Sequence, residues 1–252
     1  MTAAEAPVSP STVAALMQSI GDPQSSVARV AEVVAGDTGL AARVLAVANS
    51  ASFGLSRQIT RVDQAVALAG TNMVQTLAIA GANHLLDSRV GLPGARQHAV
   101  TVACATRLLA ARAGVSAGDA FAAGLLHDLG EMLLWRQDPD AYAAAHASWP
   151  DPGTQLRAER GRYGTDHALL AREQLASWHV PGVIVDAVGD HHRPDLHHRD
   201  LSTAVVAGEG LADDDVAWSD LFELFDVAPD AVPQLRAELR AQVDDVSGLL
   251  PA

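Results

Sequence analysis

The stretch that decides the fold is AAGLLHDLGEMLLW, residues 122–135, an apolar helical run interrupted by the adjacent polar residues His127 and Asp128. Neighbouring residues of a helix point about 100° apart, so these two side chains serve one site only if it wraps over the helix edge. A metal centre does this, since imidazole and carboxylate both bind divalent transition metals. The alternative is a buried or capping polar pair at a helix kink near Gly130. An isolated His-Asp dipeptide would favour that alternative.

The composition around this stretch predicts an all-α fold. The chain has 252 residues, 49% of them hydrophobic and only 4% aromatic, and lacks convincing alternation of β-branched and polar residues. The longest interruption of helical periodicity in the first half is DSRVGLPGARQ, residues 87–97. We therefore predict a small N-terminal helical bundle over residues 1–90 and a larger bundle with a C-terminal tail helix over residues 91–252.

Helix periodicity and stop residues predict the individual helices on both sides of this junction. The first bundle is expected to contain helices near residues 11–20, 25–35, 39–49, 61–69 and 72–87. The second is expected to contain helices near residues 95–113, 117–136, 139–147, 154–161, 166–178, 182–190, 201–212 and 230–246.

Charge and cysteine content exclude several classes of function. All 17 basic residues are Arg, against 30 acidic residues, for a formal charge of -13, which excludes lysine chemistry and argues against nucleic acid as the main partner. The single Cys104 lies in an apolar helical stretch and predicts a core residue, not a disulfide or metal ligand. We find neither a signal peptide nor an apolar run of about 18 residues, so we expect a soluble cytoplasmic protein without membrane contact.

The histidines are concentrated after the predicted junction. Of ten, only His84 precedes it. Besides the His-Asp pair, imidazoles stand near helix ends at His98, His167 and His191-His192. Singly, each is more typical of a surface or helix-terminal residue; together they resemble a ligand set gathered in the core of a helical bundle.

The order of these motifs resembles the HDOD family, the HD-related output domains of bacterial signalling proteins. The resemblance covers about residues 10 to 212 and rests on four stretches: NSASFG (49–54), ITRVDQAVALAGTNMVQTLAIA (59–80), AFAAGLLHDLGEMLL (120–134) and ERGRYGTDHALLAREQLASWHVPGVIVDAVGDHHRP (159–194). It implies a small N-terminal bundle packed on a larger HD-like bundle. It also implies a regulatory role through protein contacts, here with a signalling partner supplied in trans.

The resemblance also implies a ligand set for divalent metal. His98, His127 and Asp128 match the first metal site of HD phosphohydrolases, and Glu209 stands in AGEGLADD where the family pattern has an Asp. The positions that supply a second metal in the cyclic di-GMP-degrading branch are matched by His167, His191 and His192. The implied ion is Mn, Fe, Zn or Mg.

Two departures weaken a phosphodiesterase function. The sequence reads HHRPDLHH where the cyclic di-GMP-degrading branch has Gly-Tyr-Pro, and Glu131 replaces a basic residue that would hold phosphate. We interpret His179, His197 and His198 as surface residues.

Three interpretations therefore stay open. The first is a regulatory protein without catalysis, the second a metal-dependent phosphohydrolase, and the third a helical fold with satisfied buried histidines. The NSASFG stretch is best explained as a turn with Phe53 in the core, the alternative being an interaction surface. The partner, the metal and the oligomeric state are not determined by the sequence.

Overall fold

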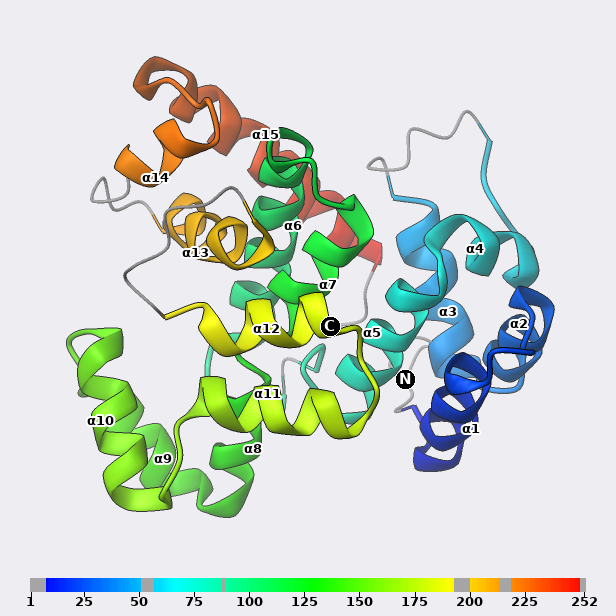
Figure 1. Ribbon diagram of the computed structural model, residues 1–252, viewed down its shortest axis with the longest axis horizontal. Helices are drawn as coiled ribbons and strands as arrows, with labels where there is room; N and C mark the ends of the chain where they lie inside the picture. The colour runs from blue at the N-terminus through cyan, green and yellow to red at the C-terminus, as the bar shows by residue number, and fades with distance from the viewer. Residues whose placement is uncertain (1–7, 51–56, 88, 193–199, 214–218, 250–252) are drawn as a thin grey trace.

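The computed structural model describes residues 8–50, 57–87, 89–192, 200–213 and 219–249, and within these ranges it contains helices and no strand. The all-α prediction is confirmed. The N-terminal bundle lies on one side of the molecule (Figure 1) and comprises α1 (Pro10–Gly21), α2 (Val27–Ala35), α3 (Thr38–Ala48), α4 (Val62–Ala69) and α5 (Thr71–Ala82).

The larger bundle is built around two central helices, α6 and α7 (Figure 1). Its helices are α6 (Ala95–Ala113), α7 (Ala117–Leu126), α8 (Leu129–Gln137), α9 (Pro139–His146), α10 (Pro152–Tyr163), α11 (His167–Ser177), α12 (Gly182–Asp190), α13 (Leu201–Ala212), α14 (Ser219–Leu224) and α15 (Val232–Leu249), with a 3-10 turn at Pro229–Ala231.

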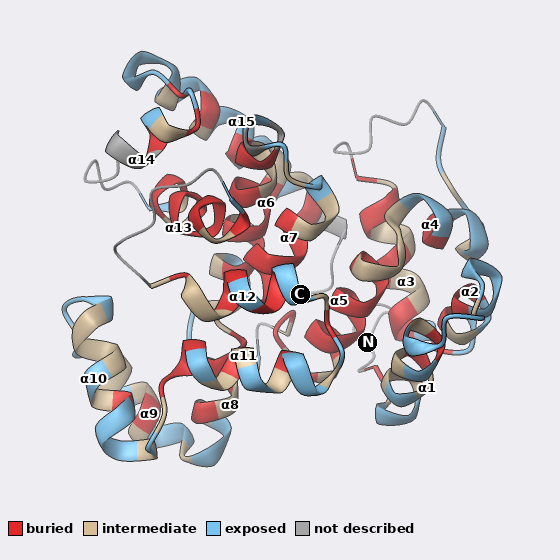
Figure 2. Ribbon diagram, viewed as in Figure 1, coloured by how far each residue is buried: buried red, intermediate tan, exposed pale blue. Residues whose placement is uncertain are grey.

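Helix α5 joins the two bundles. Every residue from Met73 to Gly81 is buried (Figure 2), because this helix packs against α1 and α3 on one side and α7 on the other. Polar contacts add to the apolar ones: the Asn72 amide donates to Asp119 at 2.9 Å, and the Gln75 amide donates to the carbonyl of Trp178 at 3.2 Å. The N-terminal bundle thus packs directly on the larger one, while the division into domains at residue 90 stays a prediction.

Small residues let α6, α7 and α13 approach one another closely. A Cβ atom on Gly124 of α7 would lie 2.7 Å from the Cα of Ala103, and one on Gly208 of α13 would lie 2.5 Å from Oγ1 of Thr106. Ala103 and Thr106 both belong to α6 and are buried. Because larger side chains would separate these backbones, the glycines allow the ends of the three helices to share one site.

The structure corrects two predicted helices and adds another. The helix predicted over residues 72–87 ends at Ala82, after which the chain forms turns. The single helix predicted over residues 117–136 is two helices, because the chain leaves helical geometry at Asp128 (φ -96°, ψ 18°) between α7 and α8. Helix α14 was not predicted. Cys104 is fully buried, as expected. Phe53, His197 and His198 lie outside the described residues, so the predictions for them stay untested.

The helices of the described ranges do not individually meet the requirements of a membrane span. No single one is both long and apolar enough; only α4 and α5 together meet the length and composition test, and they are bent by 105° at the break between them.

Candidate metal centre

The seven residues predicted from the sequence lie together in the larger bundle. They come from the first turn of α6, the α7–α8 junction, the start of α11, the end of α12 and the middle of α13. Consecutive close contacts connect them all: His98 Nε2 to His127 Nε2 at 3.2 Å, His127 Nε2 to Asp128 Oδ2 at 3.0 Å and to Glu209 Oε1 at 3.3 Å, Asp128 Oδ1 to His191 Nε2 at 3.6 Å and to His167 Nε2 at 3.8 Å, and His167 Nε2 to His192 Nε2 at 2.9 Å.

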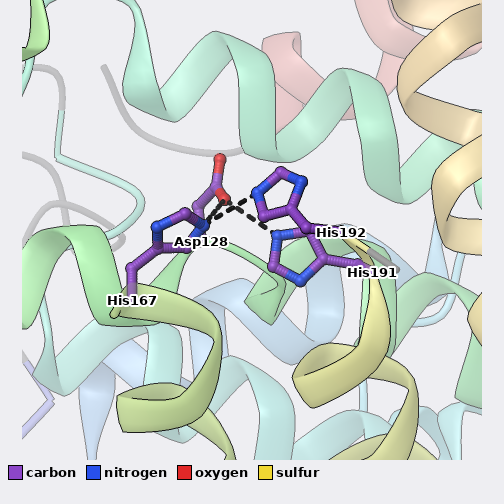
Figure 3. A group of neighbouring side chains, drawn as sticks. All are labelled: Asp128, His167, His191 and His192. Carbon is purple, nitrogen blue, oxygen red and sulfur yellow. Dashed lines mark hydrogen bonds and ion pairs between the residues drawn. The ribbon is translucent and has the colours of Figure 1, made fainter. Parts of the chain in front are cut away.

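The carboxylate of Asp128 divides the cluster into two halves. Its Oδ2 atom faces His98 and His127, at 3.4 and 3.0 Å. Its Oδ1 atom faces His167 and His191, and the side chains of these residues and His192 point toward one another (Figure 3). We call the first group, with Glu209, the His98 side, and the second, with His192, the His167 side.

Three of the imidazoles are held with their Nε2 atoms toward Asp128. The Nδ1–H of His127 donates to the carbonyl of Gly124 at 2.8 Å, and that of His191 donates to the carbonyl of Val188 at 2.6 Å. The Nδ1–H of His167 donates to Oε2 of Glu159 at 2.8 Å. Because Nδ1 carries the hydrogen, each Nε2 lone pair is directed into the cluster, which is the tautomer that a metal ligand needs.

Glu159 is a functional residue that the sequence reasoning missed. It lies on α10, its side chain is fully buried, and its Oε2 atom also accepts the backbone N–H of His167 at 2.8 Å. The hydroxyl of Tyr142 donates to Oε1 at 2.6 Å. The motif ERGRYGTDH contains Glu159, but the flanking Arg157 and Arg160 are just as polar, so the pattern did not show which side chain turns inward.

The family follows from the comparison with protein-family models. The model of the HDOD domain matches residues 6–194, three quarters of the chain. The chain belongs to the HDOD family. The matched range of this HDOD protein includes every predicted ligand except Glu209, which α13 brings to the site from beyond the matched range.

Solved structures share the fold of this HDOD protein. A protein of Shewanella amazonensis SB2B, provisionally assigned as a phosphohydrolase, is 25% identical with a TM-score of 0.72, over 99% of this chain and 96% of that one. A second protein of the same organism, provisionally assigned as a metal-dependent phosphohydrolase, is 18% identical with a TM-score of 0.65, over 96% and 91%. A provisionally assigned signal transduction protein of Marinobacter aquaeolei VT8 is 20% identical with a TM-score of 0.67, over 97% and 59%.

One curated relative also matches. An uncharacterized protein of Treponema pallidum (strain Nichols) is 23% identical over 221 residues, which are 80% of this chain and 41% of the relative. The chain therefore spans less than half the length of that relative.

The two carboxylates of the HDOD site have opposite pKa shifts. Burial alone would raise the pKa of Asp128, but the surrounding imidazoles, His127 first and then His191 and His98, bring it well below the ordinary value. Burial raises the pKa of Glu209 to about 7, and the negative charge of Asp128 adds to this against the opposing imidazoles. Asp128 is therefore an ionised carboxylate at neutral pH, while Glu209 titrates near neutrality.

Without an ion, a proton occupies each half of the site. Burial lowers the pKa of His98, but the bond and charge of Asp128 outweigh it and raise that pKa to about 9. The pKa of His167 is likewise raised to about 9, because Glu159 outweighs burial. Burial and the charges of the neighbouring imidazoles lower the pKa of His192 to about 2. Protonated His167 therefore donates to neutral His192, and His98 to His127, at positions where an ion would replace the proton.

The carboxylate of Glu131 contacts neighbouring side chains of the protein. It accepts a hydrogen bond from Gln155 of α10 and lies 3.6 Å from Nε2 of His146, and the side chain is 13% exposed. The bond to Glu131 raises the pKa of His146, with burial opposing it. The predicted repulsion of phosphate by Glu131 is therefore partly offset by these two donors.

The donor set fits a divalent metal. Nε2 of His191 is buried without a hydrogen-bond partner, and such an orphaned lone pair is costly unless an ion or water satisfies it. The ligand atoms of Asp128, His167, His191 and His192 lie within 4.8 Å of one another, as do those of His98, His127 and Asp128. Because imidazole dominates, the set favours Fe or Zn over Mg, while the carboxylates also suit Mn. His98 is 39% exposed, so the site is open to solvent on that side.

Proposed function

We propose that this HDOD protein is a metal-binding regulatory protein of bacterial signal transduction, which acts through contacts with a signalling partner. The observation that carries the metal assignment is the convergence of three buried imidazoles on Asp128, each with its Nδ1–H already donated elsewhere. Oriented lone pairs around an ionised carboxylate are what a metal site requires, and a core of satisfied histidines would not leave Nε2 of His191 unpaired.

The residues would divide between two ions. Asp128 would bridge, with one oxygen toward each half; His98, His127 and Glu209 would complete one ligand set and His167, His191 and His192 the other. Bound there, a divalent ion supplies Lewis acidity and lowers the pKa of a bound water. In a regulatory protein the same charge stabilises the junction of six helices, so that loading changes the surface a partner meets.

A second candidate function is metal-dependent phosphoester hydrolysis at the same centre. The observation that favours it is the bridging position of Asp128, because two-metal sites are typical of phosphatases and nucleases. The provisional assignments of two structural neighbours as phosphohydrolases agree with it. Against it stand Glu131 and the missing Gly-Tyr-Pro motif, which weaken the case for phosphate binding.

Elemental analysis of the purified protein tests the metal assignment. We expect Mn, Fe or Zn near two equivalents in the wild type and about one in His127→Ala, which removes a ligand of the His98 side only, with circular dichroism to check folding. The matched control is His179→Ala, because His179 is exposed and far along the chain from any ligand. A wild-type protein purified from medium with these ions that retains none of them would overturn the proposal.

Hydrolysis assays separate the two candidates. The loaded protein is incubated with bis(p-nitrophenyl) phosphate and with a cyclic dinucleotide. No turnover in either supports the regulatory function. Robust turnover in both the wild type and His179→Ala, abolished in His127→Ala, would replace it with the phosphohydrolase.

A further inference from the structure

The α9–α10 arm, residues 139–163, is joined to the rest of the protein in an unusual way. Apolar side chains of the arm do not enter the main core; they form a separate cluster in which Leu92, Leu134 and Tyr142 are buried. In Figure 1 the arm lies at the edge of the molecule opposite the N-terminal bundle. A segment with its own small cluster opens locally at a lower free energy than the main core.

Polar contacts make up most of the remaining attachment. Arg162 of the arm pairs with Asp138 at 2.6 Å, and because both side chains are exposed this pair contributes little to stability. Arg160 is also exposed, but it pairs at 2.6 Å with Asp166, whose side chain is buried. The buried contact is different: Glu159 holds both the ring and the backbone N–H of His167. The arm is therefore anchored most firmly where it meets the metal centre.

His167 also differs from the other oriented ligands. His127 and His191 donate their Nδ1–H groups to carbonyls of their own chain segments, three residues earlier, so local geometry holds them. His167 donates to a side chain of another helix. Its orientation therefore depends on where α10 lies.

We infer that Glu159 is the positioning residue through which the α9–α10 arm holds His167 in its ligating orientation, so that arm seating and metal binding on the His167 side favour one another. The inference rests on the proposed metal centre. An ion on Nε2 makes the Nδ1–H of His167 a better donor to the Glu159 carboxylate, and the seated carboxylate makes Nε2 a better ligand. By linkage, a partner that draws the arm away lowers metal affinity, and metal loading opposes that partner.

Titration with Co²⁺ tests the positioning role. Isothermal calorimetry should show two binding steps in the wild type. In Glu159→Gln we expect the affinity of the His167 side to fall tenfold or more, as for other partners of metal-bound histidine, with the His98 side unchanged. The matched control Tyr142→Phe removes one of the two hydrogen bonds to Oε1 of Glu159, the other coming from Gln155, and leaves Oε2 on His167, so a smaller loss is expected. In the proton NMR spectrum of the Co²⁺ protein, the exchangeable Nδ1–H signal of His167 should shift in Glu159→Gln and keep its position in Tyr142→Phe.

Hydrogen exchange on the wild type and on two ligand variants, all with Glu159 in place, keeps the inference testable if Glu159→Gln fails to fold. Backbone amides of residues 139–163 should exchange more slowly with Mn²⁺ than without it. His167→Ala should abolish this protection, whereas His98→Ala should retain part of it. Metal binding without any protection of the arm, or equal weakening of both sides in Glu159→Gln, overturns the inference alone. A wild type that binds no metal overturns the proposed function and this role together.

Discussion

Gly130 lies directly against the backbone of His167: a Cβ atom at position 130 would lie 2.6 Å from the carbonyl carbon and 2.7 Å from the Cα of His167, and would overlap its carbonyl oxygen. Gly130 follows the His-Asp pair on α8, and His167 begins α11. The absence of a side chain therefore lets the start of α11 reach Asp128. Close approach of two backbones explains this glycine better than a kink does.

Gly130→Ala should damage both stability and the His167 side of the centre. Backbone atoms cannot move aside as a side chain does, so we expect a loss of about 1–3 kcal/mol in the free energy of unfolding, typical of overpacking. Urea denaturation measures it, and calorimetric titration should show weaker binding of one ion.

Gly161→Ala is the matched control for this substitution. Gly161 also lies within a helix, and a Cβ there meets nothing within 4 Å. An unchanged or slightly raised stability is expected, since alanine favours helix. Equal effects of the two substitutions would contradict the close-approach argument.

Removal of metal should lower the melting temperature. An ion present at a hundred times its Kd adds about 2.7 kcal/mol per site to the free energy of unfolding. For a domain of this size each kcal/mol corresponds to about 2–4 °C. Scanning calorimetry before and after chelation should therefore show a fall of several degrees in the wild type and in His179→Ala. His127→Ala, which keeps the His167 side, should show about half of it, and a chelator-insensitive wild type would count against a structural ion.

Metal binding should release protons in a pH-dependent manner. His98 and His167, with pKa values of about 9, carry a proton at pH 7 and must lose it before Nε2 binds an ion. Affinity should therefore rise as the pH is raised toward 9, where fewer protons remain to be displaced. Calorimetry in two buffers of different ionisation enthalpy measures the number released, expected between two and three at pH 7, because Glu209 with a pKa of about 7 adds part of a proton, and smaller above pH 9. Release that is independent of pH would argue against both imidazoles as ligands.

Asp37 should make the N-terminal bundle sensitive to acid. Its Oδ1 atom caps α3 by accepting the backbone N–H of Leu40. Its Oδ2 atom accepts the backbone N–H of Ser9 at 3.0 Å and the hydroxyl of Thr12 at 2.8 Å. Burial opposes these bonds, but together they lower the pKa of Asp37 below 3.8. A lowered folded-state pKa adds stability above the unfolded value, and this stability is lost as the pH falls through the folded value.

The substitution that tests this is Asp37→Ala. Loss of a helix cap and of a buried acceptor should cost about 1–3 kcal/mol at pH 7. The difference from wild type should shrink as the pH falls below about 4, where the carboxyl of the unfolded chain is protonated first, and should be lost once the pH passes the lower pKa of the native carboxylate. A difference that stays constant from pH 7 to pH 3 would show that charge is not involved. Asp151→Ala, which removes a more exposed cap from α10, is the comparison.

Much of the helix order could be predicted because helix boundaries are local. The predicted limits of α6, α12 and α13 agree with the structure, since Gly94 and Gly114 flank the first and Asp200 caps the last. The prediction failed at residues 117–136, where apolar periodicity continues through the His-Asp pair although the backbone turns. Periodicity does not reveal a break whose polar residues are satisfied by other helices.

By itself, the sequence determined the helical class, the family and the residues able to bind metal, because composition, capping and motif order are properties of neighbouring positions. Only the tertiary structure decided that Asp128 faces two pairs of imidazoles and that Glu159, not its arginine neighbours, turns inward to His167. The physical reason is that the direction of a side chain is set by the crossing of helices far apart in the chain. Here those crossings depend on close approaches at Gly124, Gly130 and Gly208.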